Sequence, residues 1–354
     1  MIVPANIELR NVLDAFNAVP DVATRNYYAC PTPPTKPVGA LCSHFKGIAA
    51  FADKLIFTHT DVDDGATSGK YLIADKLGAG CQGVVDAIYD TQEQNWCHPC
   101  SSQACGSFMA MGIQASETSG DDSVIQICDL RPTLGNEPMV VLGRIAHKGG
   151  VNGVGMTKEA GPGGRYLVAG VNGHELTLYR STSDSLQPSQ IGFEQVYHTK
   201  EFAESGAGLA LATQTDGRIF MFTLNANDDG SDNVMCLYSI DLAAGEPLSK
   251  LPGERKMAVP GVSQTLTDLL SYMLNDQQTP LANALILFLW SVAEPYMNSS
   301  FRWGKGLAIT SPDSVTVYAS DRNVFSLSQI APSRQDFSLV VWGAPDAQAT
   351  PTLP

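Results

Sequence analysis

The sequence predicts an all-β protein, a five-bladed β-propeller with a helical hairpin inserted in its last third. Two observations favour this fold class. A pattern of short apolar strands recurs along the chain, with a spacing of about 50 residues that is typical of four-stranded blades. The composition is rich in turn-forming residues, with 32 Gly and 21 Pro. The whole chain, 1–354, is therefore expected to form a single domain.

Each repeat begins with a strand of small and apolar residues, as at 208–212 (GLALA). A second apolar strand follows, and then two strands of more amphipathic character. Small residues in the first strand fit a position near the central axis, where blades converge and space for side chains is short. The blades predicted in this way cover 43–90, 98–145, 150–198, 205–260 and 301–342.

The segment 263–297 separates the fourth and fifth repeats and predicts two helices. Leu266 and Leu269 follow helical spacing in the first, while Thr279 and Pro280 provide an N-cap and a first-turn proline for the second. The helical hairpin is expected to cover part of the propeller. A lid over the functional site and a dimer contact are the alternatives.

The charge balance limits the classes of partner. The chain has 36 acidic and 22 basic residues, a formal net charge of −14, whereas nucleic acid and anionic membranes require a basic surface. The longest apolar run, 281–292, is too short to span a bilayer, and no secretory signal pattern is visible. We therefore expect a soluble protein, with the cytoplasm favoured, that binds a small molecule or a carbohydrate.

Four of the six histidines recur at the repeat spacing, 54, 49 and 51 residues apart, namely His44, His98, His147 and His198. Connections from the outer strand of one blade to the inner strand of the next lie on one face of a propeller, so these rings are expected to meet at the axis. Converging imidazoles bind Fe, Cu or Zn. The alternative is a structural role, in which each ring is hydrogen-bonded within its own repeat.

Four other residues are candidates for catalysis or substrate binding. Lys46, Arg302 and Lys305 stand at the start of inner strands, where they would bind a carboxylate or a phosphate. His59 follows a second strand and is a candidate for acid–base catalysis. The alternative for the basic residues is that they neutralise nearby acids, namely Asp61, Asp63 or Asp321.

A calcium site is a further hypothesis. The loop 225–230 resembles the first half of a calcium-binding loop, with oxygen ligands alternating at Asn225, Asn227 and Asp229. Cys236 stands where a bidentate Glu would close such a loop. A solvated turn is the alternative.

The eight cysteines fit either reduced thiols or up to four disulfides. Cys97, His98, Cys100 and Cys105 lie close together in the sequence, as zinc ligands do. A structural zinc site usually needs a second well-spaced pair, which is not visible.

The repeats resemble those of five-bladed propellers, a group that includes sugar-binding lectins and glycoside hydrolases. Glycosidase activity needs carboxylates on several inner strands, and these inner strands carry almost none. The four spaced histidines resemble instead those of the carotenoid-cleaving oxygenases, in which four histidines on the axis of a propeller hold iron. Those enzymes have seven blades and longer chains, so only the ligand arrangement is similar.

The favoured interpretation is a propeller with a ligand site on its axis, a metal-dependent enzyme of the oxidoreductase or lyase class acting on a small anionic or polar substrate. The sequence lacks a nucleophile elbow, a P-loop, a dinucleotide fingerprint and an H-E-x-x-H motif. Two alternatives remain: a lectin-like module without catalysis and a scaffold for protein interactions.

Overall fold

The computed structural model describes residues 6–30, 44–60, 68–78, 80–93, 96–114, 122–188, 190–204, 208–228, 230–259, 299–322, 325–326 and 335–343. The helical hairpin predicted at 263–297 lies outside these residues. Helical structure in the described part is limited to a short α-helix, α1 (Val12–Ala18), and one 3-10 turn, η1 (Arg131–Gly135). None of the described helices is long and apolar enough to cross a membrane. The all-β prediction is confirmed for this part of the chain.

Three sheets are four-stranded antiparallel meanders in which neighbours in sequence are neighbours in space. The first contains β6 (His98–Cys105), β7 (Phe108–Gln114), β8 (Ser123–Asp129) and β9 (Val140–His147). The second contains β10 (Gly153–Lys158), β11 (Tyr166–Asn172), β12 (Glu175–Ser181) and β13 (Phe193–Thr199). The third contains β14 (Gly208–Thr213), β15 (Ile219–Asn225), β16 (Val234–Ile240) and β17 (Leu248–Lys256).

The fourth sheet joins the two ends of the chain. Its strands from the first half are β1 (Thr24–Ala29), β2 (His44–Phe51), β3 (Lys54–Thr60), β4 (Lys70–Asp75) and β5 (Gln82–Asp90). Those from the last part are β18 (Ser300–Ser311), β19 (Ser314–Ser320), β20 (Phe325–Ser326) and β21 (Gln335–Trp342). The order is β1-β5-β4-β3-β2-β18-β19-β21-β20, and β1 also pairs with β21, so eight of the nine strands form a closed mixed sheet.

The prediction of five separate blades is therefore wrong, because the first and fifth predicted units are one sheet. Two glycines allow this: β18 and β2 pair at Lys305 and Gly47, and a Cβ on Gly306 would lie only 1.8 Å from the carbonyl oxygen of Ile48. The fifth unit also departs from a meander, since β21 rather than β20 pairs with β19. Four sheets result instead of five.

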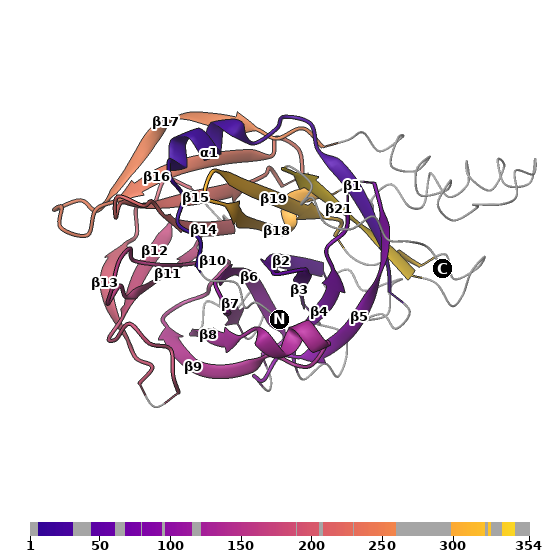
Figure 1. Ribbon diagram of the computed structural model, residues 1–354, viewed down its shortest axis with the longest axis horizontal. Coiled ribbons are helices and arrows are strands. Elements are labelled where there is room, and N and C mark those ends of the chain that lie inside the picture. Colours follow the sequence, from indigo (N-terminus) through magenta and orange to yellow (C-terminus); the bar gives the residue numbers. More distant parts are fainter. Residues whose placement is uncertain are drawn as a thin grey trace, which may run out of the picture.

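The first strands of the predicted units nevertheless surround a common centre. Contacts run from β2 to β6, β10, β14 and β18 and back to β2, and β6 also contacts β14 and β18 across the middle. Figure 1 shows these strands at the centre of the molecule, with β5, β9, β13 and β17 outside them. We call β2, β6, β10, β14 and β18 the inner strands.

Polar side chains connect the inner strands. The Thr58 hydroxyl accepts from the backbone N–H of Gly47 at 2.7 Å and donates to the carbonyl of Cys100 at 2.7 Å. The Gln103 amide accepts from the N–H groups of Met156 and Leu211, both at 2.7 Å, and donates to the Leu211 carbonyl. These bonds satisfy backbone groups that separate sheets would otherwise leave buried without partners.

The N-terminal segment forms α1 and β1, which the repeat pattern did not predict. Asn11 caps the helix by accepting from the backbone N–H groups of Leu13 and Asp14. Phe16 on the buried face of the helix lies 6.2 Å from the ring of Phe222. β1 then pairs along its length with β21 and at three positions with β5, which closes the sheet. Both α1 and β1 therefore contribute residues to the core.

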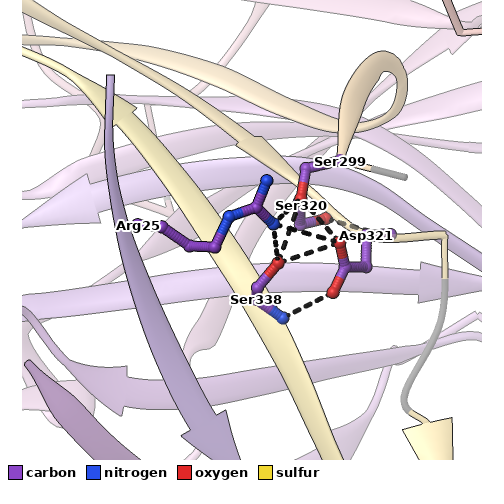
Figure 2. Close-up of polar contacts among 5 residues, drawn as sticks. All are labelled: Arg25, Ser299, Ser320, Asp321 and Ser338. Carbon is purple, nitrogen blue, oxygen red and sulfur yellow. Dashed lines mark hydrogen bonds and ion pairs between the residues drawn. The ribbon is translucent and has the colours of Figure 1, made fainter. Parts of the chain in front are cut away.

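A buried polar network fixes this closure (Figure 2). Arg25 of β1 donates to the hydroxyls of Ser299 at 2.9 Å and Ser338 at 2.5 Å. Asp321 accepts from both hydroxyls and from the backbone N–H of Ser338, and one of its oxygens lies 3.8 Å from the Arg25 guanidinium. Each of these four side chains is at most 7% exposed. The network links β1 and β21 to the residue that follows β19 and the residue that precedes β18, through a paired internal charge.

Candidate functional site

Lys305 is the most unusual charged residue at the centre of the inner strands. Its side chain is buried, with 7% exposure. A Cβ built on Gly208 would lie 2.9 Å from each of the last carbons of the lysine stem, Cγ, Cδ and Cε. The stem of Lys305 thus runs from β18 against β14, and the glycine at that position of β14 makes room for it.

The ammonium of Lys305 has no acidic partner among the described residues: none of the ion pairs or hydrogen bonds found there includes it. The groups that act on it electrostatically are Lys46 of β2 and Cys100 of β6. Burial and the Lys46 charge lower the pKa of Lys305 to about 7. A buried lysine without a carboxylate partner is costly to the fold, and perturbed groups of this kind gather at functional sites.

Other cations gather at the same end of β18. The guanidinium carbons of Arg302 and Arg322 each lie 4.8 Å from the centre of the Trp303 ring. The His44 ring lies 5.5 Å from the same indole in an edge-on arrangement. Arg302 is exposed. With Lys305 on β18 itself and Lys46 on the neighbouring strand β2, this part of the inner strands is basic in a chain whose net charge is −14.

His98 at the start of β6 is neutral, and its tautomer follows from its neighbours. The amide oxygen of Gln114 accepts a hydrogen bond from the backbone N–H of Val151. The amide nitrogen of Gln114 therefore faces His98 Nδ1, at 2.8 Å, and donates a hydrogen bond to it. The ring proton is therefore on Nε2, which is buried and has no hydrogen-bond partner in the described part of the chain. Burial and the charge of Lys46 lower the pKa of His98 to about 3.

The four spaced histidines do not meet in one place, which corrects the prediction of an axial metal centre. His44 and His98 begin inner strands and lie 5.6 Å apart, whereas His147 and His198 lie on the outer strands β9 and β13. The latter two act on each other electrostatically. No group of three or more His, Cys, Asp or Glu side chains suited to a metal is found in the described residues, which include all six histidines.

The local partners of these histidines explain the difference. His147 Nδ1 lies 2.9 Å from the Tyr179 hydroxyl, and His198 Nδ1 lies 3.0 Å from the Thr177 hydroxyl. To bind a metal through Nδ1, His98 would have to lose its hydrogen bond with Gln114. Its other ring nitrogen, Nε2, carries the proton and therefore has no free lone pair for a metal. Similar spacing in the sequence places the four histidines near the junctions between the predicted repeats, but His44 and His98 lie on inner strands and His147 and His198 on outer strands.

The cysteine cluster does not form a zinc site either. The Cys100 sulfur lies 3.5 Å from His98 Nδ1, but that nitrogen already accepts from Gln114, so His98 does not act as a base toward this thiol. The Cys105 thiol donates to Asn6. Cys105, Cys128 and Cys236 are thiols, which excludes four disulfides. Burial raises the pKa of Cys105 and of Cys128 to about 12, so both are unreactive.

The remaining predicted residues lie elsewhere. His59 is fully buried on β3, with its ring 5.0 Å from that of Phe45, within the apolar packing between β2 and β3. Asp321 belongs to the Arg25 network and forms neither an ion pair nor a hydrogen bond with Lys305. Asp61 and Asp63 lie outside the described residues. Asp229 also lies outside the described residues, so the calcium hypothesis stays a prediction. Of its other proposed ligands, Asn225 donates a hydrogen bond to Glu204 at 2.8 Å.

Sequence reasoning missed three residues of this centre: Gly208, Gln114 and Trp303. Gly208 was visible only as a small residue of a first strand, and its role depends on a lysine that is distant in sequence. Gln114 stands at the end of a second strand, with no motif around it. Trp303, between Arg302 and Lys305, offered the clearest signal, because aromatic rings next to basic residues often stack with them.

Comparisons with known proteins identify no family. No protein-family model matches the chain, and no curated protein does. Among solved structures, the chain is similar to the catalytic domain of the GH62 alpha-L-arabinofuranosidase of Coprinopsis cinerea, with a TM-score of 0.40 and 11% sequence identity over 92% of this chain and 100% of that one. A likeness at this TM-score supports no inference about function.

Proposed function

We propose that the centre of the inner strands binds a small anionic ligand, held by Lys305 with Lys46 beside it. The observation that carries this proposal is the Lys305 ammonium, 7% exposed and without an ion pair in the described part of the chain. Burying a charge is unfavourable unless a partner compensates it. An anion at this point supplies the missing partner.

The chemistry favours a carboxylate or a phosphate of small size. Lys46 provides a second cation that acts on Lys305, and Arg302 and Arg322 at Trp303 extend the basic region. An anion steered to these groups would be repelled by most of the surface of a protein with a net charge of −14. Binding would therefore be local and specific to this basic region rather than a general surface effect.

Binding and protonation are linked. An anion favours the charged form of the lysine, so occupancy raises the pKa of Lys305 from about 7 and the protein takes up protons at neutral pH. Affinity for the anion is expected to fall as the pH rises above 7, since a neutral amine offers less attraction. The lectin-like and scaffold functions stay predictions, and no described contact favours them.

The test is titration with acetate and with inorganic phosphate, read by calorimetry and by NMR of ¹³C-methylated lysines. We expect one of these anions to shift the Lys305 resonance and raise its pKa, and expect Lys305→Met to lose the binding. Lys148→Met, at an exposed position, removes the same charge and should bind as the unmodified protein does. Equal binding by the Lys305→Met and Lys148→Met variants would refute the proposal.

A further inference from the structure

Lys305 has the properties of a nucleophilic amine. Only the neutral form of a lysine attacks carbon, and with a pKa of about 7 roughly half of the Lys305 side chains are neutral at pH 7. An ordinary lysine, with a pKa near 10.4, is neutral in fewer than about one molecule in a thousand at that pH. Desolvation beside another cation is a known way of activating a lysine.

The geometry around the amine supports the same role. The stem of Lys305 packs against Gly208, since a Cβ built on that glycine would lie 2.9 Å from three carbons of the stem. The side chain is therefore held in place by β14. Lys46 acts electrostatically on both Lys305 and His98, which places the three groups in one neighbourhood. His98 Nε2–H, buried and without a partner among the described residues, is a donor that a substrate oxygen can satisfy.

We propose that Lys305 forms an imine with the carbonyl group of a small oxo acid bound at this centre. The proposal rests on the anion site described above and adds the substrate class: a ligand whose carboxylate is held by Lys46 and whose ketone or aldehyde faces Lys305. A bound carboxylate raises the pKa of Lys305, so the attacking amines are the fraction of Lys305 that is still neutral in the complex.

The step is balanced without any further reactant. The nitrogen lone pair of Lys305 adds to the carbonyl carbon, and the electrons of the C=O π bond move to oxygen. The carbinolamine then loses its oxygen as water when the C=N bond forms. Two protons leave the nitrogen and end on that water, so amine plus carbonyl compound gives imine plus water. A lysine held as a permanent cation could not begin this sequence.

The experiment uses the full-length protein with three probes at pH 7: pyruvate, which has both an anionic group and a ketone; lactate, which has only the anion; and acetone, which has only the ketone. Each is incubated with sodium cyanoborohydride, which reduces an imine to a stable secondary amine, and the adducts are located by peptide mass mapping. Calorimetry without the reductant measures binding of pyruvate and lactate. Lys54, buried to the same extent but paired with acids, is the internal control for labelling.

We expect pyruvate to label Lys305 at least about tenfold more than Lys54, as the difference in neutral amine requires, and expect acetone to label it far less. Lys305→Arg keeps the charge and should bind lactate while losing the adduct. If pyruvate and lactate bind but no adduct forms at Lys305, the imine is refuted and the anion site stands. If neither binds and acetone labels Lys305 as well as pyruvate does, the anion site is refuted instead. The imine is also refuted if the adducts are spread evenly over the exposed lysines and their total amount is the same in Lys305→Arg.

Discussion

Lys54 and Lys305 are two lysines of one closed sheet with almost the same burial, 6% and 7% exposed, and opposite electrostatics. Lys54 at the start of β3 lies 2.5 Å from Asp75 and 3.0 Å from Asp86. Burial acts to lower the pKa of Lys54, but the hydrogen bonds to these two carboxylates outweigh it, and the pKa is raised. Lys305 lacks such partners in the described residues, and burial lowers its pKa to about 7.

The comparison separates two uses of a buried cation. Lys54 is paired across neighbouring strands, and Arg25 is paired with Asp321 (Figure 2), so both stabilise the sheet in which they lie. Within the part of the chain that the structure describes, Lys305 has no compensating carboxylate at the point where the inner strands meet. Proteins tolerate an uncompensated charge of this kind mainly where function requires it. Four changes test this distinction.

The largest effect is expected from Asp321→Asn. It leaves the Arg25 guanidinium buried at the closure of the sheet without its carboxylate, which typically costs about 3–5 kcal/mol. The free energy of unfolding from urea titration measures the loss. Asp184→Asn removes an exposed carboxylate and should change stability by less than about 0.5 kcal/mol. Similar values for the two variants would show that the network does not hold the closure.

Lys305→Met should increase the free energy of unfolding, whereas Asp321→Asn lowers it. Below pH 7 the lysine is charged in both folded and unfolded states, and its burial penalty is fully present; the penalty disappears as the pH rises from about 7 to the unfolded value near 10.4. The variant is expected to be more stable than the original protein by roughly 2–4 kcal/mol at pH 6 and about equally stable at pH 10. Urea titrations at the two pH values measure this. A loss of stability at pH 6 would mean that Lys305 has a structural partner.

The Asp75→Asn, Asp86→Asn double variant should make Lys54 resemble Lys305. Without the two carboxylates, only burial acts on the lysine, so its pKa should fall below the ordinary value, at a cost in stability of about 1–3 kcal/mol. NMR of ¹³C-methylated lysines follows the pKa of Lys54 directly. If that pKa stays raised, burial is not the cause of the difference between the two lysines.

Gly208→Ala should have the smallest effect on stability, about 1 kcal/mol, because the new methyl group displaces the stem of Lys305. The pKa of Lys305 should rise as its ammonium moves toward solvent, and imine trapping by pyruvate should weaken. Gly245→Ala, where no atom lies within 4 Å of the new Cβ, is the matched control. An unchanged pKa in Gly208→Ala would show that the stem is not held by β14.

The histidines show where prediction from the sequence stops. Their spacing was correctly seen, but His44 and His98 start inner strands while His147 and His198 lie on outer ones. A shift of a few residues at a blade junction moves a side chain from the centre of the molecule to its edge. Spacing along the chain does not resolve such a shift, because strand ends are set by hydrogen-bond register in the sheet.

The basic residues were found more easily than their roles. Lys46 and Lys305 were recognisable as cations at the start of inner strands, since a charge next to small and apolar residues is conspicuous. Their mutual effect, and the lack of a carboxylate at Lys305 among the described residues, depend on how β2, β6, β14 and β18 meet. No local sequence pattern contains this information. The same applies to Gln114, whose bond to His98 sets the tautomer of that ring.

The sequence by itself determined the β character of the described chain, the strands of small residues that surround its centre, and the presence of basic side chains among them. These depend on local periodicity and residue size, which neighbours in the chain share. The tertiary structure alone decided that the first and last units merge into one closed sheet, and that Lys305 is buried beside Lys46 with no carboxylate partner among the described residues. Both depend on glycine contacts and charge pairs between residues far apart in the chain, and their energies exist only once the strands have come together.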